Sequence, residues 1–314
     1  MTMHDSPGTD RVRTPSEGVF FADGLVTLYC GSADQVLAGM PAGSVDCIVT
    51  SPPYYGLRDY QIEGQTGIEP TPAGYIEALA VVFAQARRVL ADHGTLWLVL
   101  GDSYSTKKRG SDNGWESSRL SNPARVQKMQ SAAMRQGRVV CFDRKAKNLL
   151  GMPWRVAFAL QDQGWILRNE IVWAKSNPMP ESVTDRLSCS HEKVFLFSKA
   201  NRYHFNKSAV GRNPGDVWVI PTVPFAGAHF AVFPPELPRR AIAAGCRPGG
   251  VVLDMFSGSG TTGLAAAELG HRYVGVDLNP AYLELSLRTR LEQPSLTAQA
   301  NAAIVNEYDN KKGA

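Results

Sequence analysis

The sequence predicts an α/β fold, a doubly wound and mostly parallel sheet of the Rossmann type. Short apolar segments with strand character alternate with amphipathic helical segments along most of the chain, which is the order of a sheet covered by helices on both faces. The 314 residues are 44% hydrophobic and 20% charged. This composition provides a core for one large domain and excludes a disordered chain.

The N-terminal half contains three predicted strands and one long helix. Residues 25–30, 45–50 and 95–100 are short apolar segments bounded by turn residues, as strands are. Residues 75–90 carry apolar side chains at helical spacing, namely Tyr75, Ile76, Leu79, Val82, Phe83, Ala86, Val89 and Leu90.

The middle of the chain continues the alternation. Residues 152–164 predict a helix with Pro153 in its first turn, where the missing amide proton of proline does no harm. Residues 165–175 and 192–199 predict two more strands, joined by a proline-rich segment.

A glycine-rich turn lies near the C-terminus, in VVLDMFSGSGTTGLAAAELGHRYVGVDLNPAY. The apolar strand 251–254 enters this turn, and a helix and the strand 273–276 follow before Asp277. The three glycines in G-x-G-x-x-G order are Gly258, Gly260 and Gly263. Glycines let the backbone approach a ligand closely, and an acid after the second strand can accept hydrogen bonds from both hydroxyls of a ribose. In this context the motif indicates a nucleoside cofactor.

A rigid bend ends the strand 45–50, because Ser51, Pro52, Pro53 and Tyr54 follow it directly. Consecutive prolines remove two backbone donors and fix φ, so the segment can join neither a helix nor a strand ladder. In open α/β sheets ligands bind at the carboxyl ends of the strands where the strand order reverses. If strands 251–254 and 45–50 are neighbours there, the glycine-rich turn and the bend face one cleft.

At these two motifs the chain resembles the S-adenosylmethionine-dependent DNA amino-methyltransferases. It is similar to the permuted β group, in which the catalytic motif precedes the cofactor motif. TSPPYYGLRDY matches the catalytic signature [S/N/D]-P-P-[Y/F], and the form with Ser is typical of the cytosine-N4 branch. DMFSGSGTTG, VGVDLNPAY, AHFAVFPPELPRRAI, NEIVWAKSN and HEKVFLFSK match further segments, so that the resemblance covers most of residues 20–290. It implies a circularly permuted methyltransferase sheet with inserted DNA-recognition segments, and base flipping in double-stranded DNA.

The resemblance implies that Ser51, Pro52, Pro53 and Tyr54 are catalytic. Residues implied around the cofactor, S-adenosyl-L-methionine, are Phe256, Gly258, Gly260, Thr261 and Thr262, with Asp277 on the ribose and Asp254 beneath the loop. Asp254 as a mere brace of the turn is the competing interpretation. Relatives usually carry Gly-Asp where this chain has Gly31-Ser32, so Ser32 or Asp34 is expected to replace that acid near the adenine. His229 is a further candidate at the cofactor edge.

The chemistry supports a role for the bend independently. An exocyclic amine of cytosine or adenine is a poor nucleophile because its lone pair is delocalised into the ring. Hydrogen-bond acceptors for both amine hydrogens, here the Ser51 hydroxyl and the Pro52 carbonyl, expose that lone pair to a methyl sulfonium. The flipped base can stack on Tyr54.

Positive charge is concentrated between the strand 95–100 and the helix 152–164. Residues 107–147 contain eleven Lys or Arg and three acids in a chain of net charge +4. Such a segment suits phosphate tracking along DNA, and a solvated loop is an equally good interpretation. The candidate DNA-binding residues are Lys107, Lys108, Arg109, Arg119, Arg125 and Lys128.

The expected organisation is one catalytic domain, residues 18–292, between loose ends at 1–17 and 293–314. Its target-base half is 18–200 and its cofactor half 229–292. DNA-recognition insertions are expected at about 105–148 and 176–228.

Composition also sets expectations about partners and location. Five scattered cysteines without a C-x-x-C pair predict neither a disulfide framework nor a metal site. Without a long apolar segment or a signal peptide, the chain is expected in the bacterial cytoplasm, whether bacterial or phage-encoded, and not in a membrane. Double-stranded DNA is the expected partner, and a homodimer and an accompanying restriction enzyme stay open.

Several alternatives remain beside cytosine-N4 methylation. Adenine-N6 transfer uses the same cleft, usually with Asp in place of Ser51, and is the second candidate. Protein-glutamine methylation resembles the motif with Asn there, without the permuted order. Methylation of cytosine C5 needs a Pro-Cys pair, which the sequence lacks. A nicotinamide oxidoreductase would explain the glycine-rich turn alone, and a catalytically inactive DNA-binding module would not need the intact bend.

Overall fold

The structure is a computed structural model that describes residues 18–105, 145–224 and 232–291. The predicted loose ends, His229 and the six candidate DNA-binding residues at positions 107–128 lie outside these ranges. Within these ranges, no helix has the length and apolar character needed to cross a membrane.

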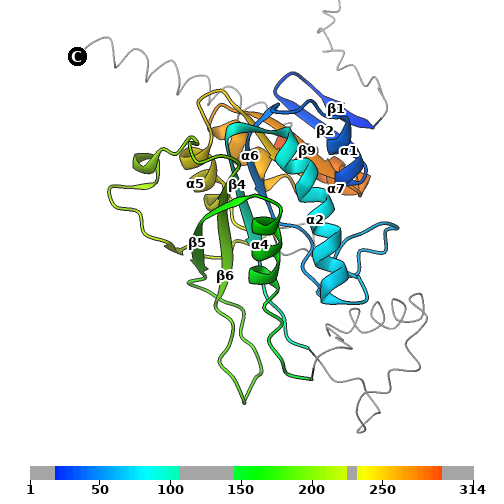
Figure 1. The fold of residues 1–314 in the computed structure, drawn as a ribbon, viewed down its shortest axis with the longest axis vertical. Coiled ribbons are helices and arrows are strands. Elements are labelled where there is room, and N and C mark those ends of the chain that lie inside the picture. Colours follow the sequence, from blue (N-terminus) through cyan, green and yellow to red (C-terminus); the bar gives the residue numbers. More distant parts are fainter. Residues whose placement is uncertain (1–17, 106–144, 225–231, 292–314) are drawn as a thin grey trace, which may run out of the picture.

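The described residues form one mixed sheet in the order β1-β2-β9-β8-β3-β4-β6-β5-β7 (Figure 1). Its strands are β1 (Val19–Ala22), β2 (Val26–Cys30), β3 (Val45–Thr50), β4 (Leu90–Leu100), β5 (Ile166–Ala174), β6 (His191–Ser198), β7 (Val217–Val219), β8 (Val251–Asp254) and β9 (Arg272–Asp277). The central run from β2 to β4 is parallel, whereas β6 is antiparallel to both of its neighbours and β1 is antiparallel to β2. The predicted mostly parallel, doubly wound fold is therefore confirmed.

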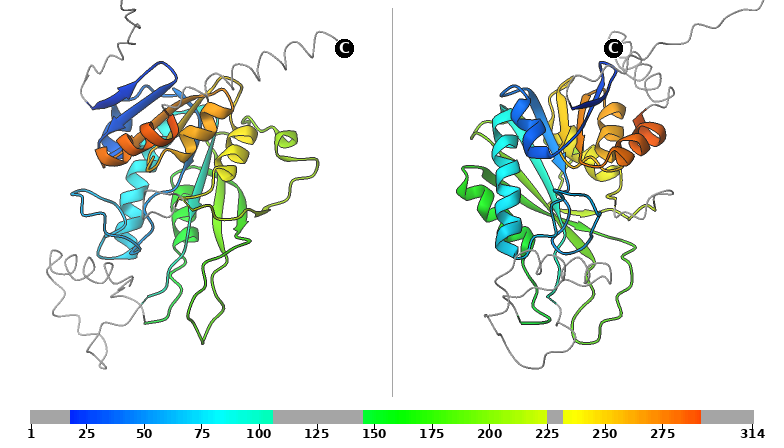
Figure 2. Two further views of the ribbon diagram at one scale, coloured as in Figure 1. Left: turned by 180° about the vertical axis from the view of Figure 1, so that it is seen from behind. Right: turned by 90° about the vertical axis from the view of Figure 1, so that its right-hand side faces the viewer.

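Helices cover both faces of the sheet (Figure 2). One face carries α1 (Ala33–Gly39), α2 (Pro72–Val89) and α4 (Met152–Asp162), which pack side by side. The other carries α5 (Glu236–Gly245), α6 (Thr261–Glu268) and α7 (Pro280–Ser286), continued by the π-helical turn η3 (Leu287–Leu291), and the short 3-10 helix η2 (Lys207–Val210) packs on α5. Each layer encloses its own cluster of buried apolar side chains.

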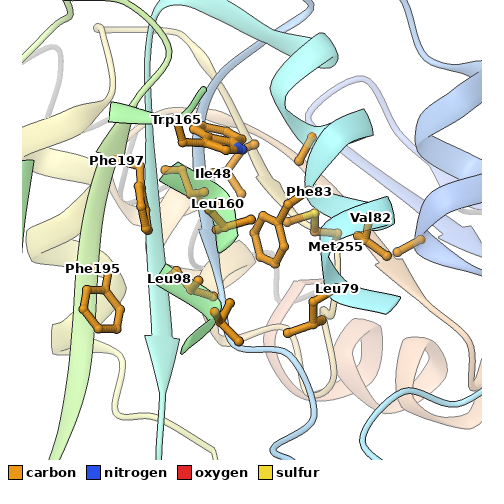
Figure 3. Packing of buried hydrophobic residues seen from close by; sticks show 14 of the residues in the cluster. Ile48, Leu79, Val82, Phe83, Leu98, Leu160, Trp165, Phe195, Phe197 and Met255 are labelled. Carbon is orange, nitrogen blue, oxygen red and sulfur yellow. The ribbon is translucent and has the colours of Figure 1, made fainter. Parts of the chain in front are cut away.

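The helix α2 shows how the sequence pattern becomes packing. The hydroxyl of Thr71 accepts a hydrogen bond from the Gly74 amide and caps the helix, and Pro72 occupies the first turn. The helix therefore begins three residues before the predicted start at Tyr75. Its apolar stripe turns Leu79, Val82 and Phe83 toward side chains of β3, β4 and α4 (Figure 3). Complete burial of one such side chain contributes about 1.5–3 kcal/mol to the free energy of folding.

Candidate active site

The carboxyl ends of β3 and β8 lie side by side, because these strands pair in parallel with Cys47 opposite Val252 and Ile48 opposite Leu253. The segment that follows each strand therefore opens on the same edge of the sheet. The predicted neighbourhood of the Ser-Pro-Pro-Tyr bend and the glycine-rich turn is confirmed.

Between them lies a cleft of about 480 Å³. The predicted site residues that line it are Ser32, Ser51, Pro52, Pro53, Tyr54, Asp254, Phe256, Gly258, Thr261 and Asp277. Both loops thus meet in one cavity, large enough for a nucleoside-sized ligand.

The bend is fixed from behind by α2. Tyr75 is fully buried and its hydroxyl donates a hydrogen bond of 2.9 Å to the carbonyl of Pro53. The ring of Tyr55, also buried, packs 5.5 Å from the Tyr75 ring. Two side chains thus hold the bend rigid while Ser51 and Tyr54 line the cleft.

The Tyr54 ring lies against the backbone of Gly101 at the end of β4. A Cβ atom at Gly101 would be 2.6 Å from the ring, so no larger residue fits there without displacing it. The Tyr54 hydroxyl accepts a hydrogen bond from the Ser51 hydroxyl at 3.4 Å and donates one to the Glu192 carboxylate at 2.5 Å. Burial, reinforced by the Glu192 charge, raises the pKa of Tyr54 well above its ordinary value, so that the phenol keeps its proton.

Glu192 was not among the residues predicted for the site. It lies at the start of β6, and its second carboxylate oxygen accepts a hydrogen bond from the Lys175 ammonium at 2.5 Å. Its neighbour His191 is exposed. The sequence predicts a strand that begins at Glu192, but the contact of Glu192 with Tyr54 depends on the pairing of β6 with β4, which no local pattern reveals.

Asp254 lies beneath the glycine-rich turn and is only 1% exposed. Its carboxylate accepts hydrogen bonds from the hydroxyls of Thr50 and Thr262, both at 2.7 Å, and from the Phe256 amide at 3.1 Å. Burial raises the pKa of Asp254 to about 6, against these stabilising hydrogen bonds. The residue ties the ends of β3 and β8 to the loop, which agrees with both expected roles, beneath the loop and as a brace.

Asp277 ends β9 and faces the cleft. Its two carboxylate oxygens accept hydrogen bonds from the Gly258 amide at 2.7 Å and the Asn279 amide at 2.8 Å. Burial raises the pKa of this carboxyl group. Each oxygen keeps a further lone pair for a ligand hydroxyl.

The three glycines of the turn have different functions. Gly258 and Gly260 have positive φ, 51° and 73°, which side-chain-bearing residues rarely adopt. Gly263 lies on α6, where a Cβ atom would be 2.6 Å from the Tyr273 ring. The first two therefore shape the turn, and the third permits close packing of the helix on the sheet.

Other predicted residues lie around or behind the cleft. Ser32 donates a hydrogen bond to Asp34, and both line the cleft. Gly260 lies against Ser286, behind the turn. Thr262 is fully buried and reaches Asp254, so it supports the loop from below.

The sequence missed two aromatic residues of the cleft wall. Tyr60, in the segment after the bend, and Tyr282, on α7, line the cleft with their rings 6.3 Å apart, edge to face. Their approach depends on where the long segment after the bend folds back, for which the sequence gives no periodic signal.

Asp102 lies just after β4 and accepts a hydrogen bond from the Met152 amide at the start of α4. Its side chain therefore satisfies one of the amides that the first turn of that helix leaves unpaired. In the described parts of the chain, no group of three His, Cys, Asp or Glu residues is arranged to hold a metal ion.

The residues of the cleft fit S-adenosylmethionine. A buried carboxylate at the end of β9 is suited to ribose hydroxyls, backbone amides of a positive-φ turn lie beside it, and aromatic rings flank it. Fold and cleft together define a Rossmann-type methyltransferase in which the bend at residues 51–54 lies opposite the cofactor loop.

Comparison with known proteins gives the family. The family described as DNA methylase matches residues 45–288. The Type II methyltransferase M.XycI of Xanthomonas campestris pv. cyanopsidis is 45% identical over 288 residues, which cover 89% of this chain and 91% of that protein. The chain belongs to this DNA methylase family and is an S-adenosylmethionine-dependent DNA amino-methyltransferase.

Solved structures agree with the fold. TTHA0409, a putative DNA modification methylase of Thermus thermophilus solved with S-adenosyl-L-methionine, is 26% identical, with a TM-score of 0.56 over 83% of this chain and 91% of that one. PvuII DNA methyltransferase, described as cytosine-N4-specific, is 19% identical with a TM-score of 0.64 over 88% and 92% of the two chains. At that identity the second likeness concerns the fold alone.

Proposed function

We propose that this enzyme methylates the exocyclic N4 amine of cytosine in double-stranded DNA, after the base has been flipped into the cleft. The observation that carries the proposal is the arrangement of Ser51, Pro52, Pro53 and Tyr54 on a rigid bend that faces Asp277 and Phe256 across one cavity. Ser at the first position of the motif, which resembles the cytosine-N4 branch, supports cytosine over adenine.

The cofactor half binds and orients S-adenosylmethionine. S-adenosylmethionine supplies an electrophilic methyl group on a sulfonium. Asp277 would accept hydrogen bonds from the ribose hydroxyls, and Ser32 or Asp34, which also line the cleft, would replace the missing acid at the adenine. Phe256, Gly258 and Thr261 complete the wall, whereas Asp254, Gly260 and Thr262 hold the loop from behind.

The target-base half prepares the exocyclic amine of the flipped cytosine for methyl transfer. The Ser51 hydroxyl and the Pro52 carbonyl accept hydrogen bonds from its two hydrogens, which moves the nitrogen toward a tetrahedral form with an available lone pair. Pro53, held by Tyr75, fixes the angle between these acceptors and the ring of Tyr54. The flipped base stacks on that ring.

The two insertions, 105–148 and 176–228, are proposed to contact DNA beside the cleft. Their described parts contact each other, because Lys147 pairs with Asp185. The Arg186 guanidinium also lies 4.1 Å from the centre of the ring of Tyr104, which directly precedes the first insertion. The loop between β5 and β6 extends beyond the sheet (Figure 1) and carries the strongly exposed Met179 and Leu187. Such apolar side chains can insert between base steps and partially unstack them.

The experiment that tests this function is nucleoside analysis of DNA from a host that expresses the protein, combined with methylation-sensitive sequencing. N4-methylcytosine at one recurring sequence is the expected result. N6-methyladenine would establish the second candidate instead, and unmodified DNA would contradict both. Because M.XycI is a Type II methyltransferase, we further propose that this enzyme serves in a restriction–modification system.

A further inference from the structure

We infer that Glu192 is a positioning residue for methyl transfer: paired with Lys175, it orients the Tyr54 and Ser51 hydroxyls so that the lone pairs of Ser51 face the target amine. The inference rests on the proposed function and deepens it, because the bend alone does not determine which way a serine hydroxyl points.

A hydroxyl group is both donor and acceptor. Ser51 assists the amine only as an acceptor, so its own proton must be directed away from the cleft. The structure offers the Tyr54 oxygen, at 3.4 Å, as the receiver of that proton. This separation is long for a hydrogen bond between hydroxyls, as is common at catalytic contacts without substrate.

The Tyr54 oxygen can receive that proton because the phenol donates its own elsewhere. Glu192 accepts it at 2.5 Å, and a carboxylate has no proton to return. The chain of hydrogen bonds therefore runs in one direction, from Ser51 through Tyr54 to Glu192.

Lys175 fixes the other end. Its ammonium donates to the second oxygen of Glu192 at 2.5 Å and lies 5.1 Å from the centre of the Trp173 ring. The side chains of Lys175 and Glu192 are only 21% and 17% exposed, so water competes weakly for this pair.

The decisive variant is Glu192→Gln, which keeps the shape of the side chain and reverses the direction of the hydrogen bonds between residue 192, Tyr54 and Ser51. Lys175 can only donate, so it takes the new amide oxygen and leaves the amide nitrogen toward Tyr54. The phenol then accepts and turns its proton to Ser51, whose own proton points into the cleft. We expect the single-turnover rate of methyl transfer to fall about 10- to 100-fold, with unchanged affinity for S-adenosylmethionine.

A second substitution distinguishes orientation from simple damage. Lys175→Met removes the group that holds the amide, so that the amide can rotate and present its oxygen to Tyr54. The double variant Glu192→Gln with Lys175→Met should therefore be faster than Glu192→Gln alone. In a Tyr54→Phe background, Glu192→Gln should have no further effect.

The matched control is Glu170→Gln, which removes the neighbouring ion pair with Lys193 across the same two strands. It should leave the rate unchanged. Full activity of Glu192→Gln, no gain from Lys175→Met, or independent losses with Tyr54→Phe would each overturn the inference. Ser51→Ala separates the two claims, because an active Ser51→Ala enzyme contradicts the proposed mechanism, whereas an inactive one beside a fully active Glu192→Gln enzyme contradicts only the role of Glu192.

Discussion

At the residue scale, the proposed mechanism depends most directly on Ser51, because its hydroxyl would accept a hydrogen bond from the target amine. We expect Ser51→Ala to lower single-turnover methyl transfer roughly 10²- to 10³-fold, on the scale of the loss of one transition-state hydrogen bond. Calorimetry should give an unchanged affinity for S-adenosylmethionine. An unchanged transfer rate would remove Ser51 from the mechanism.

Asp277 should behave in the opposite way, since we propose that it binds the cofactor and not the target base. Asp277→Ala would remove the proposed acceptor for the ribose hydroxyls, and it removes the hydrogen bonds from the Gly258 and Asn279 amides. We expect the dissociation constant for S-adenosylmethionine to rise at least about tenfold, about 1.4 kcal/mol. A thermal melt controls for unfolding. The same dissociation constant in a folded variant would contradict the role of Asp277.

Asp254 carries a pH dependence of stability. Its pKa is raised from 3.8 to about 6 in the folded protein, so its contribution favours folding at low pH and is lost as the pH rises through about 6. Between pH 3.8 and about 6, the contribution of Asp254 to the free energy of unfolding falls by up to about 3 kcal/mol. In Asp254→Asn, the free energy of unfolding should lack this decline between pH 4 and 8. Parallel urea titrations of both proteins measure it, and identical pH profiles would contradict the prediction.

At the element scale, the strands and helices with strong periodicity could be predicted, and so could the neighbourhood of β3 and β8, whereas the pairing of the other strands could not. The strand at 45–50 and the helix with Pro153 in its first turn appear where the sequence placed them. The glycine-rich turn and the bend were recognised because each needs unusual backbone, which the sequence records as glycine and proline. The pairing of β6 with β4 is non-local, and with it the contact of Glu192 with Tyr54 escaped prediction.

Gly101, at the end of β4, sets the position of the Tyr54 ring. Adding a single methyl group at Gly101 tests whether this position matters. In Gly101→Ala the new Cβ atom would meet the ring at 2.6 Å and displace it. We expect slower methyl transfer and unchanged cofactor affinity. Gly39→Ala, at the end of α1, is the matched control, because a Cβ atom there meets nothing within 4 Å and the residue lies outside the proposed DNA-binding insertions. Equal transfer rates for both variants would show that the ring position is unimportant.

At the scale of the whole molecule, the segment that carries the excess of positive charge is distinct from the residues that line the cleft. The excess of positive charge lies in residues 107–147, outside the described ranges for the most part, whereas the described flanks pair through Tyr104 and Leu149. These flanks follow the carboxyl end of β4 and precede α4, so the segment leaves and returns near the edge that bears the cleft. DNA that delivers a base to this cleft must pass this edge.

Neutralising Lys107, Lys108 and Arg109 together should therefore weaken binding to duplex DNA and reduce the slope of log K against log salt by at most about 3, one unit for each lost phosphate contact. The affinity for S-adenosylmethionine should stay the same. A matched control neutralises the exposed Arg168, Arg247 and Arg272, which lie outside both insertions at the opposite edge of the sheet, where β8 and β9 begin. Titrations at several salt concentrations compare the two variants. A slope and an affinity unchanged from those of the unaltered protein would mean that these three charges are a solvated surface, and equal affinity after removal of the whole segment would confine the contacts with DNA to residues 176–228.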